Sequence, residues 1–183
     1  LMMFILLPRA QVAAKRINEV LDTPLSISDP ENEQPLTEEG TVEFRDVSFR
    51  YPDAEKDVFE HISFRAEKGQ TVAFIGSTGS GKSTLINLVP RFYDATDGEV
   101  LVDGVNVKDI KQSTLRSKIG YVPQKGVLFS GTVAENIGFG GKADRAGIEE
   151  AAKVAEADGF ITEMGGYDSP IAQGGKNVSG GQK

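Results

Sequence analysis

The stretch from residue 71 to residue 85, TVAFIGSTGSGKSTL, decides the fold expected for this chain. Its first part, Thr71 to Ile75, is an apolar run typical of a buried strand, and Lys82 to Leu85 begins a helical pattern. The loop between them fits G-x-x-x-x-G-K-[ST], in which backbone N–H groups turn inward on one anion. The helix adds its own unpaired N–H groups and its positive dipole end. The pattern predicts a nucleoside-triphosphate site.

Different residues of this loop are predicted to bind the phosphates and the metal ion. Lys82 reaches the terminal phosphates, and the hydroxyl of Ser83 is placed to ligate Mg²⁺. The backbone that curls around the anion is predicted to come from Gly76, Ser77, Thr78, Gly79, Ser80 and Gly81. The alternative, a flexible glycine-serine linker, is disfavoured because a linker does not sit between a strand and a helix.

Composition excludes several classes of function. The chain has 183 residues, with 39% apolar and 26% charged side chains, which suits one globular domain with appendages. A net charge of −7 makes the surface repel nucleic acid. Without cysteine there is no disulfide or thiolate metal site, and a single histidine cannot form a histidine-based metal cluster.

The chain is expected to have four parts. Residues 1–22 begin with seven apolar residues, far fewer than the roughly 20 that span a bilayer, and continue as a basic amphipathic helix. This pattern resembles the cytoplasmic end of a transmembrane helix, and an ordinary surface helix fits it equally well. Residues 23–40 are proline-rich and acidic, as in a linker. A strand-rich core is expected over 41–124 and a helical subdomain over 125–183.

Within these parts, the apolar patterns predict individual elements. Strands are expected over 41–51, 58–66, 71–75 and 119–122, and Asp103-Gly104 is typical of a hairpin turn. Helices are expected over 82–89, 109–118, 132–137, 145–157 and 160–164. Tyr51, after the first strand, is either an edge aromatic that packs on the sheet or a ring that stacks on a nucleotide base.

Taken in order, these features resemble the nucleotide-binding domain of an ATP-binding cassette (ABC) transporter, and they are most similar to the exporter type. The resemblance rests on residues 76–84 as Walker A, Tyr51 as the A-loop aromatic, Gln124 as the Q-loop glutamine and residues 178–182, VSGGQ, as the signature. It implies an α/β P-loop NTPase fold of the ABC type, incomplete here, with an antiparallel part and a helical subdomain behind an N-terminal helix.

The resemblance also implies a role for each matched residue. ATP and Mg²⁺ are the expected cofactors, with Tyr51 on the base, Thr84 on phosphate, Ser83 and Gln124 at Mg²⁺, and Lys82 and Gln124 as catalytic residues. The signature is expected to act in trans, because two such domains pair head to tail. The residues that would contact the partner's ATP are Ser179, Gly180, Gly181 and Gln182.

Two departures from the family pattern leave the function open. Exporters carry Gly-Glu-x-Gly before the signature, where this chain has Ala172-Gln173-Gly174-Gly175. Walker B, with the general base, is expected after Lys183. Three hypotheses follow. The first is an exporter ATPase whose domain lies on the cytoplasmic side of the cell membrane, beside a transmembrane domain of the same chain. The second is a regulatory half of a heterodimer that binds ATP without hydrolysing it, and the third is a soluble ATPase that acts on DNA. The acidic charge disfavours the third, so no nucleic-acid partner is expected.

Overall fold

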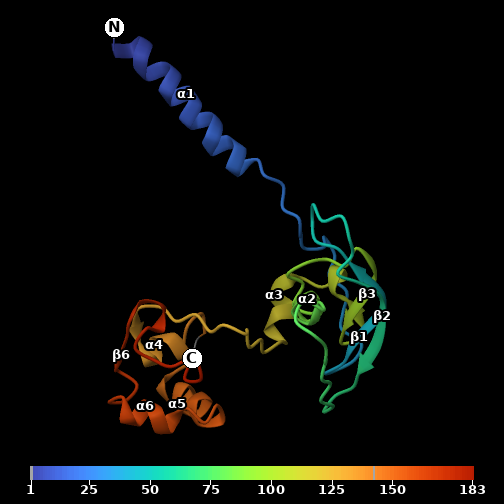
Figure 1. Cartoon of the computed structure of the whole chain (residues 1–183), viewed down its shortest axis with the longest axis vertical. Coiled ribbons are helices and arrows are strands. Elements are labelled where there is room, and N and C mark those ends of the chain that lie inside the picture. The colour runs from blue at the N-terminus through green and yellow to red at the C-terminus, as the bar shows by residue number, and fades with distance from the viewer. Residues whose placement is uncertain (1, 142) are drawn as a thin grey trace. The chain divides into compact units, whose positions relative to one another are not determined.

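The computed structural model describes residues 2–141 and 143–183, which divide into two units, Leu1–Gly120 and Tyr121–Lys183. The first unit holds a sheet and the predicted phosphate loop, and the second is mainly helical (Figure 1). The division falls after residue 120, four residues before the predicted end of the strand-rich core at 124, and the four predicted parts of the chain remain predictions.

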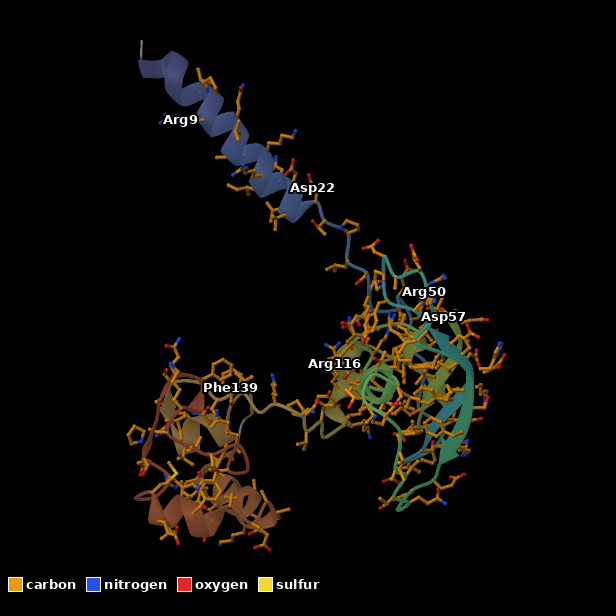
Figure 2. The ribbon with its side chains drawn as sticks, in the orientation of Figure 1. Arg9, Asp22, Arg50, Asp57, Arg116 and Phe139 are labelled. Atoms are coloured by element: carbon orange, nitrogen blue, oxygen red, sulfur yellow. The ribbon has the colours of Figure 1, made fainter. Side chains whose placement is uncertain are left out.

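The sheet of the first unit is antiparallel throughout, in the order β2-β1-β3-β4. Its strands are β1 (Val42–Phe49), β2 (Phe59–Ala66), β3 (Asp97–Val102) and β4 (Val105–Asn106). β1 lies in the middle and buries Phe44, Val47 and Phe49, which explains the apolar pattern there. At the turn between β1 and β2, Arg50 and Asp57 lie close together, 3.8 Å apart (Figure 2).

The predicted hairpin at Asp103-Gly104 is confirmed. These two residues join β3 to β4, and their φ angles are 50° and 79°. Positive φ at both central residues is what a type I′ turn requires, and its twist matches that of the flanking strands.

Helix α2 (Lys82–Leu88) is attached to the sheet through the core of the first unit. Leu85 and Leu88 are buried, and they belong to the same cluster as Phe44 and Phe49 of β1. The N-terminus of α2, where the phosphate loop ends, is therefore held at a fixed place on the sheet. The unit also contains the short 3₁₀ helix η1 (Val107–Asp109) and helix α3 (Gln112–Ser117), which replace the single helix predicted over 109–118.

Two of the predicted strands are not found in the structure. Residues 71–75 and 119–122 form no strand, and the four-stranded sheet has no ladder to either segment. Ile75 is 97% exposed and Val122 is 94% exposed, so the run that leads into the phosphate loop is not buried. The physical reason is that an apolar segment becomes a strand only where a neighbour satisfies its N–H and C=O groups.

The acidic segment before β1 is hydrogen-bonded to the first unit. The carboxylate of Asp29 accepts a 2.9 Å bond from the N–H of Gln112, the first residue of α3, and this bond lowers the pKa of Asp29. Glu33 accepts from the N–H of Lys111 at 3.1 Å. Helix α1 (Met2–Leu21) precedes this segment, and its side chains from Leu7 onward are exposed.

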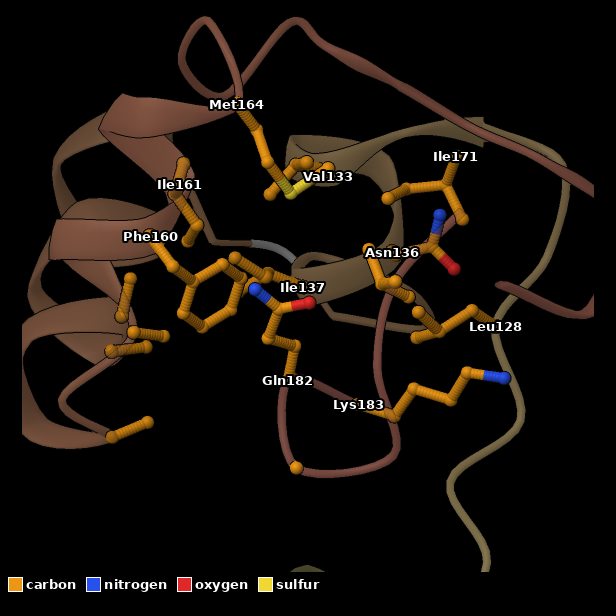
Figure 3. Close-up of a pocket in the computed structure, with 16 residues that line it drawn as sticks. Leu128, Val133, Asn136, Ile137, Phe160, Ile161, Met164, Ile171, Gln182 and Lys183 are labelled. Carbon is orange, nitrogen blue, oxygen red and sulfur yellow. The ribbon is translucent and has the colours of Figure 1, made fainter. Parts of the chain in front are cut away.

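The second unit packs short helices around a small core. Predicted helices over 132–137, 145–157 and 160–164 are found, with bounds shifted by a few residues. The elements are β5 (Gly131–Thr132), α4 (Val133–Ile137), α5 (Arg145–Val154), α6 (Asp158–Glu163), β6 (Pro170–Ile171) and η2 (Gln173–Gly175). A cavity of about 450 Å³ lies among these elements, with Val133, Phe160, Ile161 and Met164 around it (Figure 3).

Candidate nucleotide-binding site

The phosphate loop is curled around the ammonium group of Lys82. Nζ of Lys82 donates to the carbonyl oxygens of Gly76 at 2.9 Å and Ser77 at 2.7 Å, and to the hydroxyl of Ser80 at 3.2 Å. The loop thus closes around the positive charge of Lys82. A phosphate would draw Lys82 toward its own oxygens, because a charge-assisted bond is stronger than a bond to a neutral carbonyl.

Gly81, at the junction of loop and helix, shows why the pattern needs glycine there. Its φ is 85°, and an added Cβ would lie 2.8 Å from Cγ1 of Val58. A side chain at this position would therefore be both strained and crowded. Gly81 also caps α2, whose first helical bond runs from the N–H of Leu85 to the carbonyl of Gly81 at 2.8 Å. The preceding N–H groups of the first turn have no intrahelical acceptor, so they suit an anion.

Tyr51 contacts the first turn of α2, directly after the phosphate loop. Its hydroxyl lies 2.8 Å from Oγ1 of Thr84, and Thr84 is buried on α2. A threonine hydroxyl has one donor and two acceptor positions, so Thr84 can accept from Tyr51 and still donate to phosphate. The ring of Tyr51 is partly buried and packs against Phe49 of β1 with a centroid distance of 4.9 Å. Tyr51 therefore packs on the sheet and also contacts the helix that follows the phosphate loop.

The serine of SGGQ has the geometry of a helix cap. The N–H of Ser179 donates to Oε1 of Gln182 at 2.8 Å, and the N–H of Gln182 donates to Oγ of Ser179 at 3.3 Å. This reciprocal pair is a capping box, S-x-x-Q, and Lys183 adds the first helical bond to the carbonyl of Ser179 at 3.2 Å. The hydroxyl of Ser179 accepts in this arrangement, and its own proton stays available for a ligand.

Comparison with known proteins agrees with this geometry. The sequence model of the family described as "ABC transporter" matches residues 59–183. The chain belongs to the ABC transporter family. ABC transporter ATP-binding proteins of Mycobacterium bovis and Mycobacterium tuberculosis are each 48% identical to it over 183 aligned positions, which cover 97% of this chain and 31% of each relative. The chain thus spans just under a third of the length of these curated relatives.

A solved structure supports the same ABC fold. A bacterial Atm1-family ABC exporter with ATP bound matches with a TM-score of 0.91 and 33% identity, over 100% of this chain and 32% of that protein. The predicted fold class, a P-loop ATPase of the ABC type, is therefore confirmed. Among residues 2–141 and 143–183, no helix is both long enough and apolar enough to cross a lipid bilayer.

The structure brings together only part of the predicted ABC site. Walker A, Thr84 and Tyr51 meet within the first unit. Gln124 is exposed and belongs to the second unit, as do Ser179, Gly180, Gly181 and Gln182. The pairing of Ser83 with Gln124 at Mg²⁺, and the trans contact of the signature, stay predictions.

Sequence reasoning missed one aromatic neighbour of Tyr51. Tyr93, which follows α2, has its ring centroid 5.2 Å from that of Tyr51, with the two ring planes at 88°. In the sequence Tyr93 is only a tyrosine that follows the Walker A helix, and nothing there indicates a contact with Tyr51. Which ring it would contact depends on how that helix lies against β1, which no local pattern shows.

Proposed function

We propose that this chain is the ATP-binding and ATP-hydrolysing domain of an ABC exporter, and that it couples ATP-driven head-to-tail dimerisation to substrate transport across a membrane. The conformation of Walker A carries the proposal. Lys82 sits inside a curled loop at the open end of α2, and this donor set fits a polyphosphate. The family match supports the choice of ATP.

Each residue of the candidate site has a defined part in this proposal. Lys82 and the backbone N–H groups of residues 76–84 bind the phosphates, and Thr84 orients one of them through its hydroxyl. Tyr51 stacks on the base. The hydroxyl of Ser83 and the side-chain oxygen of Gln124 suit Mg²⁺, which prefers oxygen ligands and neutralises charge on the phosphates when bound.

The other wall of the site would come from a second nucleotide-binding domain. We place Ser179, Gly180, Gly181 and Gln182 against the γ-phosphate held by the partner's Walker A. Their exposure leaves them free for such a contact. A transmembrane domain of the same chain would anchor the protein in the cell membrane with this domain on the cytoplasmic side.

Replacement of Lys82 in the intact protein tests the proposal. Lys82→Ala removes the charge inside the loop, so we expect ATPase activity to fall by at least about 100-fold. Lys68→Ala is the matched control, because Lys68 is a surface lysine whose partner is Glu39 at 2.9 Å. An unchanged ATPase rate in Lys82→Ala would contradict the proposal, because Lys82 is the side chain proposed to bind the terminal phosphates.

None of the residues assigned to the site is a carboxylate. A base that accepts the proton of the attacking water normally has a carboxylate or imidazole group. We therefore propose that residues 1–183 alone bind ATP with Mg²⁺ but hydrolyse it slowly. Single-turnover hydrolysis by this segment, compared with the intact protein, tests the difference.

The second candidate is an ATP-binding regulatory half of a heterodimer. It is favoured by Gln173, which stands where exporters carry glutamate and is exposed in η2. A neutral amide there removes a charged contact to the membrane domain. In this case the intact protein binds ATP by itself but hydrolyses it only in complex with a different subunit. ATPase rates measured for the protein alone and for the complex distinguish this candidate from the first.

A further inference from the structure

The ring of Tyr51 belongs to a cluster of three aromatic rings, with Phe49 and Tyr93. Phe49 of β1, only 2% exposed, contacts it edge-to-face with ring planes at 85°. Tyr93 contacts it at 5.2 Å and 88°, and Phe49 and Tyr93 also contact each other at 5.6 Å. Perpendicular packing of this kind is the favoured geometry for aromatic pairs. Contacts with Phe49 and Tyr93 therefore fix the orientation of the Tyr51 ring.

Tyr93 lies on a segment that is itself firmly anchored. The neighbouring Arg91 is 4% exposed and forms a 2.8 Å ion pair with Asp94. Arg116 of α3 donates to the carbonyl oxygens of Pro90 and Arg91, each at 3.2 Å. These contacts tie the turn after α2 to α3, so Tyr93 has a fixed base from which to hold another ring.

We propose that Tyr93 is a positioning residue for the nucleobase, which it holds in place indirectly by fixing the ring of Tyr51. The inference rests on the proposed function, in which Tyr51 stacks on the base. A ring that is already fixed loses less conformational freedom when a base stacks on it, so binding is tighter. Tyr93 itself need not touch the ligand.

The hydroxyl of Tyr51 also contacts the Walker A helix, but phosphate binding does not depend on that contact. The same ring that Tyr93 holds places its hydroxyl 2.8 Å from Thr84 Oγ1. Phosphates can still bind through Lys82 and the backbone if Tyr51 moves, because those groups contact other partners. Loss of Tyr93 is therefore expected to weaken base recognition selectively.

Binding of MgATP and of magnesium tripolyphosphate to the intact protein, measured by calorimetry, separates the two effects. Tyr93→Ala is expected to weaken MgATP binding by about 2- to 10-fold and to leave tripolyphosphate binding unchanged. Tyr93→Phe keeps the ring and should bind both ligands like wild type. Phe139→Ala is the control, since it removes a ring that is 67% exposed and stacked on Phe129 in the second unit.

Two further variants keep the inference testable. Tyr93→Leu retains apolar volume, so it should fold even if Tyr93→Ala does not, and it should show the same selective loss. Tyr51→Ala with Tyr93→Ala should be no worse than Tyr51→Ala alone, because Tyr93 acts through Tyr51. The inference would be overturned if Tyr93→Ala weakened the binding of MgATP and of tripolyphosphate equally, or if Tyr93→Leu bound MgATP like wild type. It would also be overturned if the losses in MgATP binding from Tyr51→Ala and Tyr93→Ala were additive. Wild-type binding in Lys82→Ala would instead overturn the proposed function.

Discussion

At the scale of single residues, the paired bulges of β1 and β2 hold the one histidine of the chain. Asp46 and His61 both have positive φ, 51° and 55°, and the Nδ1 atom of His61 lies 2.9 Å from the Asp46 carboxylate. This hydrogen bond, and then the negative charge of Asp46, raise the pKa of His61 above its ordinary value of 6.5. Both side chains of the pair are exposed.

The His61–Asp46 contact predicts a pH dependence of stability. Because the folded pKa is raised, the stabilisation is fully present below pH 6.5 and is lost as the pH rises through the folded pKa. In an NMR titration the His61 signal should report a pKa above 6.5, and Asp46→Asn should lower that pKa. Asparagine tolerates the same backbone angle, so the change removes mainly the charge. Equal pKa values in the two proteins would contradict the assignment.

At the scale of elements, α2 depends on its buried face to keep the Walker A loop in place. Leu88 is 0% exposed within the core of the first unit, whereas Ile86 on the same helix is 44% exposed. The helix has only seven residues, too few to be stable in isolation. Its position, and with it the direction of its N-terminal N–H groups, comes from packing on β1 and β3.

Truncation of these two side chains tests that dependence. Leu88→Ala is expected to lower the free energy of unfolding by about 2–5 kcal/mol, because it leaves a cavity. Ile86→Ala, the control on the same helix, should cost about 1 kcal/mol or less, since much of its side chain is already in water. Chemical unfolding of the intact protein, followed by circular dichroism, measures both. Similar losses in the two variants would show that α2 is not held by its buried face.

At the scale of the whole molecule, the two halves of the proposed ATP site lie in different units. Walker A lies in residues 1–120, and the signature lies in residues 121–183. If two copies of the protein pair, each ATP would be enclosed by Walker A of one copy and the signature of the other. Closed twofold pairing then produces two equivalent sites.

Mixed dimers test this arrangement. Gly180→Asp adds a negative charge at the signature, and a Cβ at Gly180 meets no atom within 4 Å, so the change should not disturb folding. Dimers of Lys82→Ala alone, or of Gly180→Asp alone, should retain no ATP. A mixed dimer, purified with two different tags, keeps one undamaged site and should retain about half of the wild-type ATP. No retained ATP in the mixed dimer would contradict sites shared between copies.

Local chemistry was sufficient to predict much of this protein. The Walker A loop, the hairpin at Asp103-Gly104 and the positions of most helices follow from glycine placement, turn preference and apolar spacing, all of which act over a few residues. The order of these motifs also led to the ABC family. These features are encoded locally, so they can be seen without knowing how the chain packs.

The contacts between segments distant in sequence were decided only by the tertiary structure. Residues 71–75 have the sequence of a buried strand, yet they form no ladder, because a strand exists only with a hydrogen-bonded neighbour. Tyr51 meets Thr84 and Tyr93 because α2 packs across β1, and Asp29 reaches α3 because the acidic segment lies along the first unit. The sequence by itself determined the Walker A motif, because its residues are contiguous, and packing decided which side chains surround it.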